Sequence, residues 1–154
     1  MIYKAIILND YEGAHYASKV YRGEKLIETR INRLFKYRGD IVICCGKTNS
    51  VTSNAGLALC LVEIWKGRPM LESDAQAACI EFHPKRKSLL LRNWRYFSRN
   101  FKFSDFYVGG PFQGIFEILL PADVDIIPQP QILPFVEKQE EILSPNNQQL
   151  ITNN

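Results

Sequence analysis

The chain has 154 residues and a formal net charge of +3 at pH 7, with 46% hydrophobic and 23% charged residues. This composition is close to that of globular proteins and excludes a wholly disordered chain, and the length suits a single domain. No apolar run reaches the ~18–20 residues that would cross a bilayer, and the N-terminal residues lack the basic and apolar regions of a secretion signal. We therefore expect a cytoplasmic protein with no membrane partner.

The chain is predicted to begin with a strand and a helix. Residues 2–8 form a short apolar run rich in Ile, which is typical of a strand. Asp10 can cap a following helix over 11–22, in which apolar side chains recur at helical spacing. Gly23 suits the left-handed position just past the end of that helix.

Three strands are predicted next, at 26–31, 40–46 and 56–65. The third is apolar on both faces, a pattern typical of a central strand that is covered on each side. Glu63 interrupts this run. It is either solvated near the strand end or buried beside a partner.

Further strands are predicted at 78–82, 103–108 and 114–120, with a Gly-Gly-Pro turn before the last. The segment 88–101 allows two interpretations. Taken alone it predicts an amphipathic helix, because its large apolar residues recur three and four apart: Leu90, Trp94, Phe97 and Phe101. A strand followed by a loop is the alternative.

The C-terminal segment 121–154 differs in composition, since it holds five of the eight prolines and nine Asn or Gln residues. Such a segment is typical of a loosely attached extension. The sequence therefore predicts one domain over 1–120 and an extension over 121–154, with a short helix near 135–143.

Positive charge is concentrated in the predicted domain. Residues 121–154 hold one base and five acids, so residues 1–120 hold 18 bases and 11 acids. Two basic segments, 19–38 and 83–102, carry most of this charge, and the second has no acid. A basic surface favours a polyanionic partner, and an ordinary solvated surface is the alternative interpretation.

The cysteines and histidines do not form a metal-binding pattern. The two histidines are isolated, and the four cysteines include no C-x-x-C pair: Cys44, Cys45, Cys60 and Cys79. We expect reduced thiols that behave as small core residues, with no metal and no cofactor.

The most informative motif lies just after the predicted helix. Gly23, Lys25, Glu28 and Arg30 form the pattern G-x-K-x-x-E-x-R. Glu28 and Arg30 would share one face of a strand, and Lys25 can reach the same face from the preceding turn. A carboxylate between two cations can hold an anion or the edge of a base, whereas a surface ion-pair network is the alternative.

This motif resembles that of the ASCH domain, one of the PUA-like β-barrels. All four motif positions match, residues 56–63 resemble the next strand of the family, and residues 108–116 resemble its closing hairpin. The resemblance covers residues 1–120. It implies an α+β fold, a small mixed PUA-like barrel with a helix packed beside the motif and a cleft between them. It also implies an RNA-linked role and favours a strand and loop over 88–101.

A binding module is the preferred interpretation. The resemblance places a modified nucleoside, a nucleotide or an RNA base in a cleft lined by Lys25, Glu28 and Arg30. The second basic segment would then hold phosphates and stack bases, as aromatic and basic side chains do on single-stranded RNA. The candidates there are Arg92, Trp94, Arg95, Tyr96 and Arg99, with Trp94 and Tyr96 expected to be exposed.

A hydrolase is the alternative. Some proteins that resemble this family hydrolyse an acetylated cytidine with a Lys, a Thr and a Glu, and others cut single-stranded RNA. Here Lys25, Glu28 and Glu63 would be the catalytic residues. Glu28 stands where the amidohydrolase type has its Thr, and the neighbouring Thr29 is expected to face the other side of the strand. The sequence therefore favours binding without chemistry.

Overall fold

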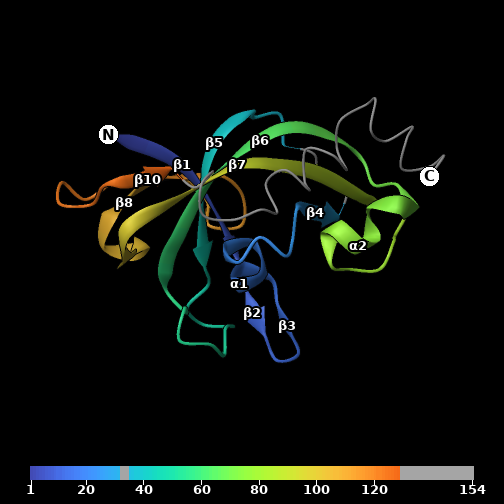
Figure 1. Cartoon of the computed structure of the whole chain (residues 1–154), viewed down its shortest axis with the longest axis horizontal. Helices are drawn as coiled ribbons and strands as arrows, with labels where there is room; N and C mark the ends of the chain where they lie inside the picture. The colour runs from blue at the N-terminus through green and yellow to red at the C-terminus, as the bar shows by residue number, and fades with distance from the viewer. Residues whose placement is uncertain (32–34, 129–154) are drawn as a thin grey trace.

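The computed structural model describes residues 1–31 and 35–128. Its elements are β1 (Ile2–Leu8), β2 (Asp10–Tyr11), β3 (Ala14–His15), α1 (Tyr16–Tyr21), β4 (Ile27–Ile31), β5 (Gly39–Cys45), β6 (Leu57–Pro69), η1 (Glu72–Asp74), α2 (Ala75–Ala78), β7 (Arg86–Lys102), η2 (Phe103–Phe106), β8 (Tyr107–Gly109), β9 (Phe116–Leu119) and β10 (Ile126–Pro128) (Figure 1).

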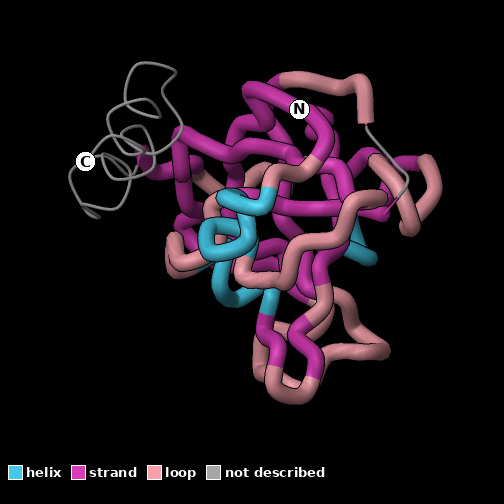
Figure 2. Tube along the Cα trace, turned by 90° about the vertical axis from the view of Figure 1, so that its right-hand side faces the viewer, coloured by secondary structure: helices cyan, strands magenta, loops and turns pink. Residues whose placement is uncertain are grey.

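Eight of these strands form one mixed sheet in the order β10-β7-β6-β5-β1-β9-β8, and β4 pairs with the outer edge of β7. Only β1 and β5 run parallel within this sheet. Strands and loops make up most of the described chain, and helical turns are few (Figure 2). The expected α+β class agrees with this architecture. The strand pairings seen in residues 1–31 and 35–128 form an open order and do not close a barrel.

The short helices lie beside the sheet, and the β2–β3 hairpin projects from it at the bottom of both views (Figures 1 and 2). Neither α-helix in the described part of the chain has the length and hydropathy needed to cross a bilayer.

Apolar side chains are buried on both faces of the central strands. One cluster contains Ile43 of β5 and Val62 of β6 together with Val20 of α1. The cluster on the other face contains Val42 and Leu61 together with the aromatic residues of β7, η2 and β9. Strand β6 is therefore central and covered on both sides, as its sequence predicted. Three of the four cysteines, Cys44, Cys45 and Cys60, are fully buried in these clusters.

The segment 88–101 belongs to the 17-residue strand β7, so the helix predicted from its spacing is wrong. The pairing of β7 with β6 contains register shifts that place extra residues on β7, one of them near Asn93, whose φ is +60°. Such bulges interrupt the alternation of a strand. Buried side chains therefore recur three or four apart, at Leu90, Trp94, Phe97 and Phe101.

The first helix is shorter than predicted, because residues 10–15 form the β2–β3 hairpin before α1 begins at Tyr16. Asp10 still caps this helix from a distance. Its carboxylate, which is fully buried, accepts hydrogen bonds from the Ser18 backbone N–H (2.9 Å), the Ser18 hydroxyl and the Thr52 hydroxyl (2.6 Å). Gly23 has a φ of +75° and ends the helix as predicted.

Two other predicted strands differ from the structure. Residues 75–78 form α2 and the chain turns at Cys79, which has a φ of +57°, so no strand forms over 78–82. Residues 103–106 form η2, which leaves only residues 107–109 as strand β8.

The sheet continues past the predicted domain boundary at 120. Strand β10 pairs with residues 95–97 of β7, and Val124 is buried against the aromatic cluster. Asp123 forms a bidentate ion pair with Arg99. The predicted helix near 135–143 lies outside the described residues.

We expect a chain ending at Ala122 to be less stable than one ending at Pro128. The shorter chain lacks β10 and Val124, and burying one Val side chain contributes about 1.5–3 kcal/mol. The free energy of unfolding of the two chains, measured in urea, should differ by at least the lower figure. Equal free energies would show that β10 contributes nothing to stability.

We also expect Asp10→Asn to lower the free energy of unfolding by about 1.5–3 kcal/mol at neutral pH, because hydrogen bonds to a charged group contribute that much. Burial raises the pKa of the Asp10 carboxyl, but the bonds from Ser18 and Thr52 together lower it below 3.8. The stability that the carboxylate contributes is present above that pH and lost as the pH falls through the lowered pKa.

The difference between the parent and Asp10→Asn should therefore shrink in acid, which denaturation at several pH values will measure. Glu12→Gln, at an exposed carboxylate in the neighbouring turn, is the matched control and should change little. A difference that does not depend on pH would contradict the role of the charged carboxylate.

Candidate functional site

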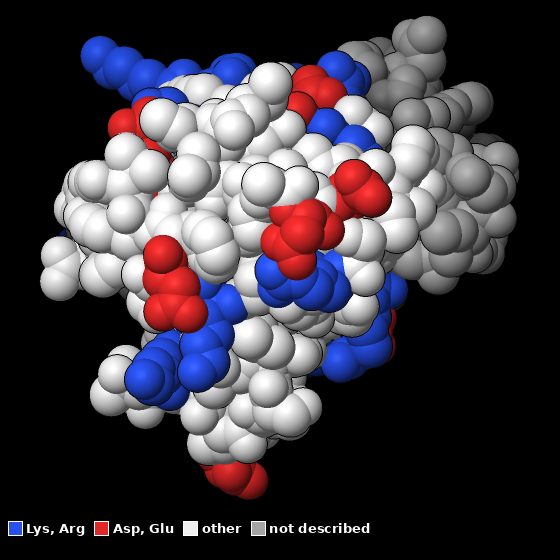
Figure 3. Space-filling model, turned by 90° about the vertical axis from the view of Figure 1, so that its left-hand side faces the viewer, with Lys and Arg blue, Asp and Glu red and all other residues white. Residues whose placement is uncertain are grey.

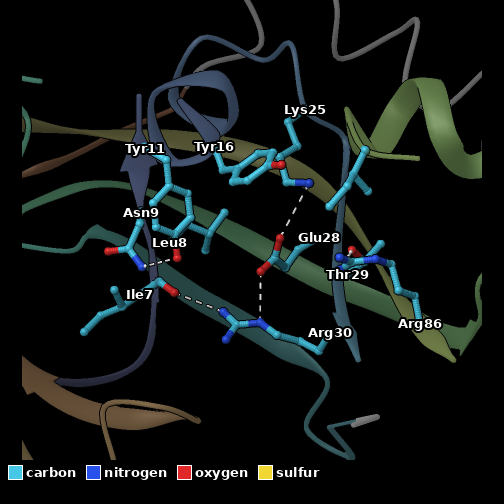
Figure 4. Close-up of a pocket in the computed structure, with 11 residues that line it drawn as sticks. Ile7, Leu8, Asn9, Tyr11, Tyr16, Lys25, Glu28, Thr29, Arg30 and Arg86 are labelled. Atoms are coloured by element: carbon cyan, nitrogen blue, oxygen red, sulfur yellow. Dashed lines mark hydrogen bonds and ion pairs between the residues drawn. The ribbon is translucent and has the colours of Figure 1, made fainter. Parts of the chain in front are cut away.

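A cavity of about 240 Å³ opens beside the motif. Five segments form its wall: the end of β1, the β2–β3 hairpin, α1, strand β4 with the turn that precedes it, and the connection from α2 to β7. The lining residues are Ile7, Leu8, Asn9, Tyr11, Tyr16, Lys25, Glu28, Thr29, Arg30, Ile80 and Arg86 (Figure 4).

Glu28 lies between the two cations of the motif (Figure 4). Its Oε2 is 2.9 Å from Arg30 Nε, and its Oε1 is 3.6 Å from Lys25 Nζ. Arg30 also donates a hydrogen bond from Nη2 to the Ile7 carbonyl (3.0 Å), which links β4 to the end of β1. Lys25, Glu28 and Arg30 all line this one cavity.

Lys25 is almost completely buried, with 2% of its surface exposed. Its ammonium donates to the Ala78 carbonyl and lies 5.2 Å from the centre of the Tyr16 ring. Burial lowers the pKa of Lys25 below 10.5, and the nearby Glu28 carboxylate opposes that change only in part. The cavity thus holds its central cation in a largely desolvated position.

The Ala78 carbonyl is positioned by a second polar network. Asp74, at the start of α2, accepts hydrogen bonds from Arg68 of β6 (2.5 and 2.9 Å), from Ser88 of β7 (2.9 Å) and from the Leu71 N–H (2.9 Å). Burial raises the pKa of Asp74, but these bonds together lower it. Because this ionised carboxylate fixes α2 on the sheet, the last carbonyl of α2 faces Lys25.

Arg86 and Thr29 complete the polar wall. Arg86 Nη1 donates to the Thr29 hydroxyl at 3.0 Å. Thr29 follows Glu28 in β4 and so alternates with it, as expected for a strand, but it is also among the residues that line the cavity. Its hydroxyl is already engaged by Arg86.

The other charged candidates lie outside the lining residues of this cavity. Glu63 forms an ion pair with Arg92 at 3.1 Å, so this predicted second acid does not join Lys25 and Glu28. Arg95 forms a bidentate pair with Asp40 (2.8 and 2.6 Å), and Arg99 forms one with Asp123 (2.9 and 2.7 Å). Basic and acidic side chains also adjoin each other on the face drawn in Figure 3. The three candidate arginines of the second basic segment, Arg92, Arg95 and Arg99, thus each have a carboxylate partner from another segment.

The predicted exposure of Trp94 is wrong, because only 1% of its surface is exposed. Its indole N–H donates to the Val20 carbonyl at 2.7 Å, which fixes β7 against α1. Tyr96 is half-buried on the same cluster, and its hydroxyl donates to the Tyr21 carbonyl at 2.7 Å. Both side chains thus contact α1, and this packing buries the Trp94 ring and part of the Tyr96 ring.

The lining residues that sequence reasoning missed include Tyr11, Tyr16 and Arg86. The two tyrosines fell within a helix predicted over 11–22, and the β2–β3 hairpin that presents Tyr11 carries no strong turn signal except Gly13. Arg86 was counted only as one base in a basic segment. Its hydrogen bond to Thr29 depends on the pairing of β4 with β7, which places Arg86 beside Ile31, two residues from Thr29.

A scan against models of protein families gives no match for this chain, and a search of curated proteins gives no significant similarity. The argument about function therefore rests on the residues and geometry of the site.

We expect Glu28→Gln to lower the free energy of unfolding by about 3 kcal/mol, because it leaves the buried Lys25 and the half-buried Arg30 without their carboxylate. Lys25→Met should cost less, since Glu28 keeps Arg30. A double-mutant cycle measured by urea denaturation should give a coupling energy above about 0.5 kcal/mol for Lys25 and Glu28.

Lys4 and Glu117 are the matched control pair, joined at 3.2 Å with both side chains 41% exposed. Exposed pairs contribute only about 0–1 kcal/mol, so Lys4→Met with Glu117→Gln should show the weaker coupling. Equal coupling in the two cycles would contradict the view that burial makes the Lys25–Glu28 pair the stronger one.

Proposed function

We propose that this protein is an ASCH-type domain of the PUA-like class, and that its cavity binds RNA or a modified nucleoside or nucleotide. The main supporting observation is the charge of the cavity wall: among the described residues, three cations, Lys25, Arg30 and Arg86, and one carboxylate, Glu28, line the cavity. This excess of positive charge favours an anionic ligand.

The same residues suit a nucleobase as well as a phosphate. Arg30 and Lys25 present N–H donors, and Glu28 presents acceptor oxygens, which together can pair with the edge of a base. Tyr11 and Tyr16 line the cavity and offer rings for contact with a flat base or sugar. At about 240 Å³ the cavity is smaller than the ~300–1,000 Å³ of typical ligand pockets. It suits one base or nucleoside.

The arrangement of the elements supports the family assignment. The resemblance to ASCH domains implies a cleft between the first helix and the motif, and here Tyr16 of α1 faces Lys25 and Glu28 across the cavity. The described strand pairings give an open mixed sheet. The PUA-like barrel is therefore a part of this proposal and not an observed feature.

Hydrolysis is less well supported than binding. Glu28 is the only carboxylate among the described residues that line this cavity, and Glu63 pairs with Arg92 instead. Thr29 carries the one candidate hydroxyl of the motif, and it accepts a hydrogen bond from Arg86. General acid–base chemistry would have to use Lys25 and Glu28 alone, and the Glu28 carboxylate opposes the lowering of the Lys25 pKa that a general base needs.

Binding is tested by titrating the protein with nucleoside monophosphates and a short single-stranded RNA in a calorimeter. We expect Lys25→Met to weaken the affinity about tenfold or more, because a hydrogen bond to a charged group contributes about 1.5–3 kcal/mol. Lys4→Met removes an equal charge outside the cavity and should leave the affinity nearly unchanged.

The folded state of each variant is checked by circular dichroism before titration. No binding by the intact protein, or equal affinity in Lys25→Met and Lys4→Met, would contradict the proposal. Incubation with acetylated cytidine and with single-stranded RNA, followed by chromatography, tests the hydrolase. Products that vanish in Lys25→Met would reverse the ranking of the two functions.

A further inference from the structure

A second cavity of about 500 Å³ adjoins the motif cavity. The two cavities share three lining residues, Tyr16, Ile80 and Arg86, so they lie next to each other beside α1 and the segment before β7. The remaining lining residues of the second cavity are Gly13, Ala14, Lys19, Cys79, Glu81, Phe82 and His83.

The charges of this second cavity are available to a ligand. Eight ion pairs join described residues, and neither Lys19 nor Arg86 takes part in any of them. The arginines of β7 that were expected to hold phosphates, by contrast, have carboxylate partners. Glu81 is the one acid among the described lining residues, and it is exposed.

Arg86 lies where the two cavities meet. Its guanidinium donates one hydrogen bond to the neutral Thr29 hydroxyl, which leaves further N–H groups for an anion. A planar guanidinium pairs well with the oxygens of a phosphate. Lys19 is one helical turn beyond Tyr16 on α1 and lines the second cavity from the same side.

The second cavity also has an aromatic ring in its wall. Phe82 is 38% exposed, so part of its ring is accessible to a ligand. His83 accepts a hydrogen bond at Nδ1 from the Lys85 N–H (3.0 Å), which leaves Nε2 as the donor nitrogen of the neutral imidazole. The second cavity therefore offers a ring for stacking, a hydrogen-bond donor and two cations. Groups of this kind bind a nucleotide of a single strand.

We propose that the ligand is an oligonucleotide of at least two residues that occupies both cavities. One base fills the motif cavity, the connecting phosphate pairs with Arg86, and the neighbouring nucleotide lies in the second cavity against Phe82 and Lys19. This inference rests on the proposed function, and it restricts the ligand from a free nucleoside to a strand of RNA.

The test compares nucleoside monophosphates with dinucleotides that contain the same base, titrated into the intact protein by calorimetry. We expect dinucleotides to bind about tenfold tighter or more, since stacking of one base on an aromatic ring contributes about 1–3 kcal/mol. Phe82→Ala should remove most of this advantage, and Phe82→Tyr, which keeps the ring, should retain it.

Lys19→Gln should weaken dinucleotide binding and leave monophosphate binding unchanged. Arg22→Gln is its matched control, since Arg22 lies on the same helix end, outside both cavities and paired with Glu24. Equal affinity for monophosphate and dinucleotide would overturn this inference and leave the proposed function standing. No binding of either ligand would overturn both.

Discussion

The ion pairs of the Glu28 carboxylate connect the segments that form the site. Through Arg30 the carboxylate is joined to the Ile7 carbonyl at the end of β1, and through Lys25 to the Ala78 carbonyl at the end of α2. Two segments far apart in the chain are thus connected across one side chain of β4. Because Glu28 and Lys25 are buried, removal of either leaves the other charge without part of its compensation.

The basic residues considered as ligand-binding candidates differ in whether they have a carboxylate partner. Arg92, Arg95 and Arg99 of β7 each face a carboxylate from another segment, so much of their charge is balanced within the domain. Arg86 and Lys19 have no such partner among the described residues and line the cavities beside the motif. Two cations without an ion-pair partner among the described residues therefore lie close to Lys25, where they would attract a ligand phosphate.

Several features could be predicted from local sequence. The apolar run of β6 predicted a strand that is covered on both faces, and Gly23 predicted the end of the first helix. The spacing of Glu28 and Arg30 predicted that they share one face of a strand. Two of the errors have causes that lie beyond the local sequence pattern. Bulges in β7 produced a helix-like spacing, and the burial of Trp94 followed from contact with α1, which no local pattern encodes.

The sequence alone determined the motif, its shared face and the mainly β architecture, because each depends on residues within one or two turns or on strand alternation. Only the tertiary structure decided that Glu63 pairs with Arg92 rather than with the motif, that Thr29 meets Arg86, and that α2 presents a carbonyl to Lys25. These contacts join segments 29 to 57 residues apart in the chain. The register of the sheet and the packing of α2 on it decide which residues make these contacts. Neither can be predicted from a single stretch of sequence.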